Sequence, residues 1–335
     1  MKKTDFPHKI CVLGAGLWGA ALADHLARLG RPVRLWEIFE EAARSLQKTR
    51  RHPHLPGFEL HRSAQVGSDM AEALSGAELV LLVVPSAFVR RTARRLGPLL
   101  ENARPRPTLV NAAKGVEPES LRTMGEAILE EMPFLGERLY TLSGPSFAKE
   151  VAAGIPTKLV LAGPAGRHGA GAARALEGGA IRVELNTDRI GVELGGSLKN
   201  VLAIGCGILD GLGAGANTKA ALIVQGMGEM GALIERLGGR RETIYGLAGL
   251  GDMIATGSSP QSRNRTLGEK LGKGKTLVQA LKEIPTVAEG VESAQSARTL
   301  ARAGKLDSPL LEAIWRVLYR GAPPRAVVAA MGFGR

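Results

Sequence analysis

Residues 9–29, KICVLGAGLWGAALADHLARL, decide the fold of the first half of this chain. The apolar run Lys9–Leu13 predicts a strand and Trp18–Leu29 predicts a helix, with a G-x-G-x-x-G turn joining them. In such a unit the first glycine permits the tight turn, the second lets the backbone approach a pyrophosphate, and the third lets the helix pack closely on the strand. The helix N-terminus then offers free N–H groups to the phosphates. We therefore predict that a dinucleotide binds at Gly14, Gly16, Leu17, Trp18 and Gly19.

Short apolar runs continue to alternate with helical stretches through the first half of the chain. The further predicted strands are Val33–Trp36, Leu79–Val84, Thr108–Asn111, Leu139–Leu142 and Lys158–Ala162. Helices are predicted between them at Phe88–Leu96 and Leu121–Glu131. Continuous apolar strands that alternate with helices predict a parallel sheet covered on both faces, because both faces of such strands must be buried.

The pattern changes near residue 186, after which strand-like runs disappear and helical segments dominate. The predicted helices are Ile190–Leu209, Lys219–Leu237, Thr276–Leu281, Val291–Ala303 and Ser308–Tyr319. The length of 335 residues also suggests two domains, since one domain typically holds roughly 100–200 residues. We expect an α/β domain with a doubly wound parallel sheet at residues 1–186, and an all-helical domain at residues 187–335.

Composition narrows the class of partner. Apolar residues make up 44% of the chain and charged residues 23%, which is ordinary for a globular protein and too apolar for a disordered one. Lys and Arg outnumber Asp and Glu by 44 to 32, so acidic partners deserve consideration. Aromatic residues are only 4%, which argues against a surface that stacks nucleic-acid bases.

The two cysteines, Cys11 and Cys206, cannot build a disulfide framework or a four-ligand zinc site. Both lie in apolar or glycine-rich runs, so we expect reduced core thiols and a cytoplasmic protein. The N-terminus resembles a signal peptide, but its apolar stretch is interrupted by three glycines, and we reject export. We find no run of about 18 apolar residues and expect no membrane span.

Glu37 directly follows the second predicted strand. An acidic residue at this place binds the ribose 2′-OH of NAD and repels the 2′-phosphate of NADP, so we favour NAD. Two alternatives stay open. Glu37 could be a solvated surface residue, and Arg44, Arg50 and Arg51 downstream could accommodate the extra phosphate.

Ligands of an open parallel sheet bind beyond the carboxyl ends of its strands. Three segments should meet there: Pro85-Ser86, Lys114 and Gly144-Pro145-Ser146. We interpret His52-Pro53-His54, with His61 nearby, as loop residues rather than metal ligands, since no Cys, Asp or Glu cluster lies at ligand spacing.

Several blocks of sequence carry a family resemblance. In order they are Gly14–Gly19, Ala113-Lys114-Gly115-Val116-Glu117, Ser143-Gly144-Pro145-Ser146-Phe147-Ala148-Lys149-Glu150-Val151, Gly196-Ser197-Leu198-Lys199-Asn200-Val201, Gly215-Ala216-Asn217, Gly246-Leu247-Ala248-Gly249-Leu250-Gly251-Asp252, Ser262-Arg263-Asn264-Arg265 and Val287-Ala288-Glu289-Gly290. Together they resemble the bacterial-type NAD(P)-dependent glycerol-3-phosphate dehydrogenases, which interconvert sn-glycerol 3-phosphate and dihydroxyacetone phosphate. The resemblance implies a Rossmann-type first domain, a substrate-binding and catalytic second domain, and a role in phospholipid synthesis.

The resemblance also implies catalytic roles for three residues. Lys199 would be the general acid/base, Lys114 a second cation at the reacting oxygen, and Asp252 a partner that orients Lys199 or the substrate. The residues themselves agree with the first role. Lys199 lies in a predicted helix among small residues that leave room for substrate, and burial would lower its pKa. The alternatives are a surface lysine for Lys114 and a turn or helix-cap residue for Asp252.

The remaining site residues follow from the same motifs. Ser262, Arg263 and Asn264 offer a hydroxyl, a guanidinium and an amide to a phosphate. By resemblance the substrate site also includes Lys114, Gly144, Ser146, Asn200 and Asp252, and the cofactor site also includes Lys114, Ala148, Arg263, Val287 and Glu289. We expect no metal.

Two other functions fit these residues less well. A related two-domain dehydrogenase of a hydroxy acid or sugar acid would not need the phosphate-binding Ser262-Arg263-Asn264. A dinucleotide-sensing or nucleic-acid-binding protein would leave Lys114, Lys199 and Asp252 without a purpose, and no nucleic-acid module is visible. The apolar helical second domain makes a homodimer plausible.

Overall fold

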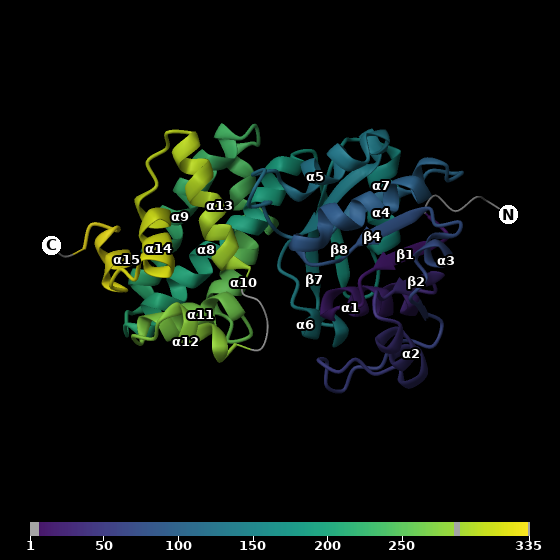
Figure 1. Ribbon diagram of the computed structural model, residues 1–335, viewed down its shortest axis with the longest axis horizontal. Coiled ribbons are helices and arrows are strands. Elements are labelled where there is room, and N and C mark those ends of the chain that lie inside the picture. Colours follow the sequence, from purple (N-terminus) through teal and green to yellow (C-terminus); the bar gives the residue numbers. More distant parts are fainter. Residues whose placement is uncertain (1–6, 285–288, 334–335) are drawn as a thin grey trace. The chain divides into compact units, whose positions relative to one another are not determined.

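The computed structural model describes residues 7–284 and 289–333, and they form two compact units (Figure 1). The first unit contains the chain up to Lys114 and Met124–Arg189. The second contains Gly115–Thr123 and the chain from Ile190 onward. The short exchanged segment belongs to the second unit because Val116 lies in its apolar core, where Ser296 Oγ donates a hydrogen bond to the Val116 carbonyl at 3.5 Å. The expected division, with one boundary after residue 186, does not assign Gly115–Thr123 to the second unit.

The first unit is built on one eight-stranded sheet in the order β3-β2-β1-β4-β5-β6-β7-β8. The strands are β1 (Ile10–Leu13), β2 (Val33–Trp36), β3 (Gln65–Gly67), β4 (Leu79–Leu82), β5 (Thr108–Asn111), β6 (Leu139–Ser143), β7 (Thr157–Ala162) and β8 (Ile181–Asn186). Neighbouring strands are parallel except β6 and β7. The sheet is therefore doubly wound and dominated by parallel pairs, as the apolar runs predicted.

Helices cover both faces of this sheet, so its central strands are buried on both sides (Figure 1). The helices are α1 (Leu17–Arg28), α2 (Glu40–Thr49), α3 (Met70–Leu74), α4 (Val89–Glu101), α5 (Met124–Glu131), α6 (Ala148–Ala152) and α7 (Arg167–Leu176), with short 3-10 turns η1 (Ser86–Phe88) and η2 (Pro133–Arg138). Alternate residues of β1 face opposite sides: Ile10 and Val12 pack with α1 and α7, whereas Cys11 and Leu13 pack with α4 and α5.

The sheet differs from the expected one in three places. The strands β3 and β8 were not predicted, because β3 has three residues and β8 alternates apolar and polar residues instead of forming an apolar run. β7 runs antiparallel to β6. The connection between these strands holds only the five-residue helix α6, and it returns the chain in the opposite direction rather than crossing over a face of the sheet.

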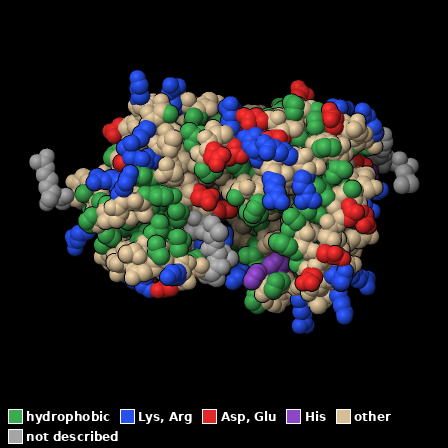
Figure 2. All heavy atoms as spheres, viewed as in Figure 1, with side chains coloured by type: hydrophobic (Ala, Val, Ile, Leu, Met, Phe, Trp, Pro, Cys, Tyr) green, Lys and Arg blue, Asp and Glu red, His purple; other side chains and the backbone are tan. Residues whose placement is uncertain are grey.

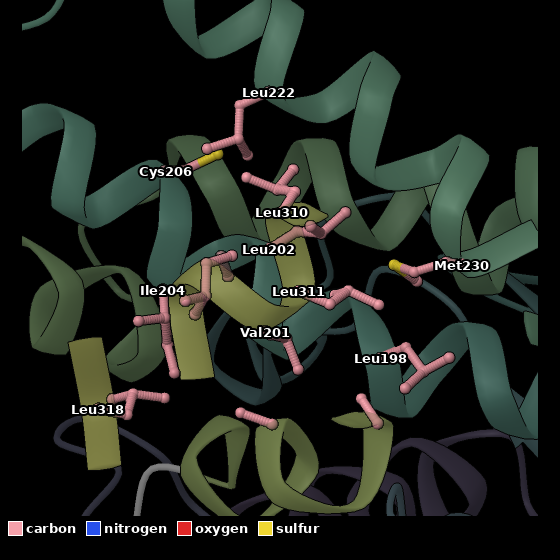
Figure 3. Close-up of a cluster of buried hydrophobic side chains, with 14 of the residues drawn as sticks. Leu198, Val201, Leu202, Ile204, Cys206, Leu222, Met230, Leu310, Leu311 and Leu318 are labelled. Carbon is pink, nitrogen blue, oxygen red and sulfur yellow. The ribbon is translucent and has the colours of Figure 1, made fainter. Parts of the chain in front are cut away.

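The second unit is helical. Its elements are α8 (Arg189–Gly211), α9 (Ala216–Arg236), η3 (Arg241–Tyr245), η4 (Leu247–Gly251), α10 (Asp252–Ser258), α11 (Arg263–Gly272), α12 (Leu277–Lys282), α13 (Gly290–Ala303), α14 (Pro309–Arg320) and α15 (Arg325–Ala329). Side chains from α8, α9 and α14 interdigitate in its core, shown in Figure 3 by Leu202, Leu222 and Leu310. Cys206 lies in this core and Cys11 in the first unit; both are free thiols whose pKa burial raises to about 12.

Helix α8 is the central element of the second unit. It is long and apolar enough to cross a membrane, with a mean hydropathy of 1.3 over its best window, yet that window is entirely buried within the fold. We therefore interpret it as the core helix of a globular unit. Glu193 and Lys199 interrupt the apolar run of this helix.

Helix α11 approaches α8 so closely that backbone meets backbone. A Cβ built at Gly207 would overlap the Arg265 carbonyl oxygen, and one built at Gly268 would overlap the Ile204 carbonyl oxygen. Gly211 and Gly272 meet in the same way one turn further on. Only glycine lets the two helices lie at this distance.

On one face of the molecule the basic side chains are distributed rather than concentrated. On the face shown in Figure 2, Lys and Arg side chains are spread over the surface with Asp and Glu among them. The arginine-rich face of α4 is partly paired, since Arg90 contacts Glu130 and Glu131 of α5 at 2.7 and 2.9 Å, and Arg94 contacts Glu131 at 2.9 Å.

Replacing Gly207 by alanine should lower the free energy of unfolding by about 1–3 kcal/mol, because the new methyl group forces α8 and α11 apart. The matched control is Gly228→Ala in α9, where a Cβ meets nothing within 4 Å. There alanine should be neutral or stabilise by up to about 1 kcal/mol through helix propensity. Chemical denaturation of both variants measures the difference; equal effects would contradict the close packing.

Candidate dinucleotide and acid-base sites

The glycine-rich turn after β1 has the geometry that its sequence predicts. Gly14 has a φ of +109°, which favours glycine, and a Cβ there would lie 2.6 Å from the Val83 carbonyl oxygen. A Cβ at Gly19 would overlap the Gly14 carbonyl oxygen, so α1 packs directly on the turn. These two glycines are therefore required by the fold of the turn itself.

Gly16 differs from the other two glycines, because a Cβ built on it would meet nothing within 4 Å. It is the N-cap of α1, and no side chain caps this helix end. The first turn of α1 therefore directs N–H groups at open space bordered by backbone. Leu17 is 36% exposed, while Trp18 packs against the sheet core. The turn fits the pyrophosphate of a dinucleotide.

Glu37 follows β2, the neighbour of β1 in the sheet. Its backbone N–H donates to the Gly67 carbonyl at 2.9 Å, and its carboxylate accepts a hydrogen bond from the Phe39 N–H at 3.1 Å. The side chain is half-buried and held at the carboxyl edge of the sheet. This is the position from which a carboxylate binds the ribose hydroxyls of a dinucleotide.

His52 has a structural role that sequence reasoning missed. Its ring is buried, with 9% exposure, and its Nε2 lies 3.0 Å from the carbonyl oxygen of Ala15 in the glycine-rich turn. The sequence offers no signal for this contact, since a histidine next to proline is usually a loop residue. No group of three metal-binding side chains occurs in the described parts of the chain.

Lys114, Gly144 and Ser146 meet at the carboxyl ends of β5 and β6. Lys114 Nζ donates to the Gly144 carbonyl at 3.2 Å, and Ser146 Oγ donates to the same oxygen at 3.1 Å. Gly144 has a φ of +118°, so the turn after β6 favours glycine here. Ala148 begins α6, which packs on α1. The first unit thus brings a cation and a hydroxyl together on one backbone turn.

A buried polar cluster in the second unit contains Lys199, Asp252 and Thr256. Lys199 Nζ lies 3.1 Å from Asp252 Oδ1 and donates to Thr256 Oγ1 at 2.6 Å; Thr256 Oγ1 in turn donates to Asp252 Oδ1 at 3.1 Å. All three residues are at most 6% exposed. An ammonium buried in this way must be paired, and the carboxylate and hydroxyl supply the pairing.

The turn η4, between η3 and α10, places α10 so that Asp252 and Thr256 contact Lys199. A Cβ at Gly249 would overlap the Ile244 carbonyl oxygen, and Gly195 of α8 lies against Gly249. The π-helical turn η4 can therefore lie close to α8. Thr256 was not predicted. The available signal was its spacing, because a residue four positions after Asp252 lies on the same helix face.

Ser262, Arg263 and Asn264 form the start of α11, but they point in different directions. Ser262 is the N-cap, and its hydroxyl accepts from the Arg265 N–H at 3.2 Å. Arg263 is exposed, whereas Asn264 is buried and its Oδ1 accepts from the Gly290 N–H at 3.0 Å.

Asn264 therefore anchors the start of α13. A Cβ at Gly290 would lie 2.7 Å from Asn264 Oδ1 and 2.8 Å from the Asn200 carbonyl oxygen, so the three residues are tightly packed. Glu289, at the N-cap of α13, is half-buried. Val287, the remaining predicted cofactor residue, lies outside the described residues.

These features define a class of protein. A doubly wound sheet with a glycine-rich turn, together with a buried lysine paired by a carboxylate and a hydroxyl, is typical of an oxidoreductase that uses NAD or NADP. The comparison with known sequences gives the family. Residues 9–167 match the N-terminal model, and residues 188–329 the C-terminal model, of NAD-dependent glycerol-3-phosphate dehydrogenase. The chain belongs to this family.

Individual relatives agree with the family models. The chain is 43% identical over 321 residues to glycerol-3-phosphate dehydrogenase [NAD(P)+] 2 of Salinibacter ruber, covering 95% of this chain and 92% of the relative. It is also 43% identical over 322 residues to glycerol-3-phosphate dehydrogenase [NAD(P)+] of Geobacter sulfurreducens, covering 96% and 95%.

Solved structures bear on the choice between a glycerol-3-phosphate dehydrogenase and a hydroxy-acid or sugar-acid dehydrogenase. The crystal structure of glycerol-3-phosphate dehydrogenase from Coxiella burnetii matches with a TM-score of 0.90 at 36% identity, covering 98% of this chain and 99% of that one. D-mandelate dehydrogenase matches with a TM-score of 0.60 at 13% identity, covering 97% of this chain and 98% of that one, which shows only a shared fold. The glycerol-3-phosphate dehydrogenase reading is thus supported over the hydroxy-acid or sugar-acid alternative.

The open space at Gly16 leads to a first test of the dinucleotide site. Gly16→Ala should leave the unfolding midpoint unchanged but raise the dissociation constant for NADH by about tenfold or more, because the methyl group occupies the space left for the pyrophosphate. Gly19→Ala should instead destabilise the fold, since its methyl group overlaps the turn. NADH titration and thermal unfolding of both variants measure the contrast. A destabilised Gly16→Ala with normal NADH binding would contradict it.

Thr256 provides a test of the buried cluster. Thr256→Val keeps the shape but removes the hydroxyl between Lys199 and Asp252, so kcat should fall by about tenfold to a hundredfold, the equivalent of one hydrogen bond to a charged group. The dissociation constant for NADH should not change. Thr256→Ser restores the hydroxyl and should recover most of kcat. Equal losses in the valine and serine variants would show that the methyl group, not the hydroxyl, matters.

Proposed function

We propose that this chain reduces dihydroxyacetone phosphate to sn-glycerol 3-phosphate with NADH or NADPH, and catalyses the reverse reaction. The observation that carries the proposal is the buried Lys199-Asp252-Thr256 cluster in a chain of this family. Reduction of a ketone needs a proton donor for the developing alkoxide, and the reverse reaction needs a base. A paired lysine shielded from water suits both tasks.

The reduced nicotinamide would supply the hydride for the substrate carbon. Lys199 Nζ would then give its proton to the alcohol oxygen, while Asp252 and Thr256 hold the lysine side chain in place. Lys114, whose ammonium reaches the Gly144 carbonyl, would bring a second positive charge to the substrate oxygen. In the reverse direction the neutral Lys199 amine would accept the hydroxyl proton.

Phosphate binding would fall to the start of α11. The exposed Arg263 offers a permanently charged, planar donor, and Ser262 and Asn264 fix the backbone on either side of it. Asn200, Gly144 and Ser146 would complete the substrate contacts. The cofactor would bind along the turn Gly14–Gly19, with Glu37 at the ribose, Ala148, Arg263, Val287 and Glu289 as further contacts, and NAD favoured over NADP.

Three finer statements belong to the same proposal. The product would feed phospholipid synthesis, the protein would work in the cytoplasm, and it would assemble as a homodimer. The apolar second unit supports the last, since large apolar side chains such as Val224 of α9 are 74% exposed.

The deciding experiment follows the absorbance of the reduced nicotinamide after dihydroxyacetone phosphate is added to the purified protein. We expect turnover with this substrate, much weaker turnover with unphosphorylated dihydroxyacetone, and a higher kcat/KM with NADH than with NADPH because Glu37 repels a 2′-phosphate. Lys199→Ala should abolish turnover and leave the dissociation constant for NADH nearly unchanged.

The matched control is Lys282→Ala, which removes an exposed lysine at the end of α12. It should retain full activity. No turnover with either cofactor would overturn the proposed function, and full activity in Lys199→Ala would remove Lys199 from its role. A preference for NADPH would overturn only the assignment of Glu37.

A further inference from the structure

The segment that follows α2 lies against the glycine-rich turn. Leu55, Phe58 and Leu60 of this segment are buried in the apolar core beneath α1 and β2. The Leu60 N–H donates to the Arg50 carbonyl at 2.8 Å, which closes the segment into a loop. This packing carries the side chain of His52 to the turn between β1 and α1.

Both ring nitrogens of His52 have partners. Nε2 lies 3.0 Å from the Ala15 carbonyl oxygen, and Nδ1 accepts a hydrogen bond from the His54 N–H at 3.2 Å. Because a carbonyl can only accept, Nε2 must carry the proton and Nδ1 must be unprotonated. The neutral Nε2–H tautomer therefore satisfies both contacts at once.

The contact is placed where it affects the turn most. Ala15 separates Gly14, which has a positive φ, from Gly16, which caps α1 and has open space where a Cβ would lie. The peptide group between Ala15 and Gly16 carries the Ala15 carbonyl at one end and the Gly16 N–H at the other. Since this peptide group is planar, fixing the direction of the carbonyl also fixes the direction of the N–H.

We propose that His52 is a positioning residue for cofactor binding: its neutral ring holds the Ala15–Gly16 peptide in the orientation that receives the dinucleotide pyrophosphate. This inference rests on the proposed function, because it requires that the turn binds NAD or NADP. Without the histidine, the Ala15 carbonyl loses its buried partner and the turn can rotate. His52 itself does not touch the reacting atoms.

Protonation should break the arrangement. A proton on Nδ1 would face the His54 N–H, donor against donor, and the ring would have to turn. Among the described residues, the titratable groups that act electrostatically on His52 are His54 from its own segment and Glu37, which follows β2. Burial is the largest influence and lowers the pKa of His52, so the neutral form prevails at neutral pH, and the dissociation constant for NADH should rise as the pH falls.

The experiment compares two amides at position 52 in the full chain without substrate. The amide nitrogen of glutamine reaches as far as Nε2, so His52→Gln can still donate to Ala15; the shorter asparagine reaches only as far as Nδ1 and cannot. NADH is titrated by its fluorescence between about pH 7.5 and about pH 5.5, the range in which histidine changes charge. His61→Gln is the matched control, because His61 is a half-buried histidine next to this loop whose ring contacts Ser63.

At neutral pH His52→Asn should raise the dissociation constant for NADH about tenfold. This is the equivalent of about 1.4 kcal/mol, or of one lost hydrogen bond. In His52→Gln the dissociation constant for NADH should stay close to that of the unchanged protein. The unchanged protein and His61→Gln should bind NADH more weakly as the pH falls. His52→Gln should lose most of this dependence, which a merely structural role would not produce.

The outcomes separate the inference from the function. Unchanged NADH affinity in His52→Asn, or the full pH dependence in His52→Gln, would overturn the inference while the enzyme activity stands. If His52→Asn does not fold, the pH profile of His52→Gln decides alone. If the unchanged protein does not bind NADH, the proposed function fails, and this inference with it.

Discussion

The second unit depends on the pairing of one buried ammonium group. Lys199 lies in the middle of α8, where an unpaired charge would cost several kcal/mol. Asp252 and Thr256 must therefore reach it, and this requires the π-helical turn before α10 and the glycines that let this turn approach α8. The core in Figure 3 then packs around a helix whose buried lysine is already paired. A polar cluster with this burial is costly to build, which makes it a candidate for a chemical site.

The first unit is constrained differently, because its glycine-rich turn must leave open space for a ligand. Gly14 and Gly19 are required by the turn itself, whereas Gly16 is surrounded by nothing that a methyl group would touch. The carboxyl edge nearby gathers Lys114 and Ser146 on the Gly144 carbonyl. Rigid contacts beneath the turn and open space above it together suit an elongated anionic ligand.

The sequence predicted those elements whose signal is local. The four-residue apolar strands, the glycine turn and the long helices of the second unit all follow from hydrophobic period and turn chemistry. β8 escaped because half of its side chains are exposed, and Thr256, His52 and the exchanged segment Gly115–Thr123 escaped because contacts distant in sequence define them. The motif blocks placed Lys199 and Asp252 among the site residues, but only the coordinates give the distance between them.

The contact of α8 with α11 constrains more than stability. Where side chains meet, a small displacement can be absorbed by a change of rotamer, but Gly207 and Gly268 bring main chain against main chain, which has no such freedom. A displacement of α11 must therefore move α8 by the same amount. Asn264 and Lys199 therefore belong to one stiff frame, and any movement of the second unit must carry both together.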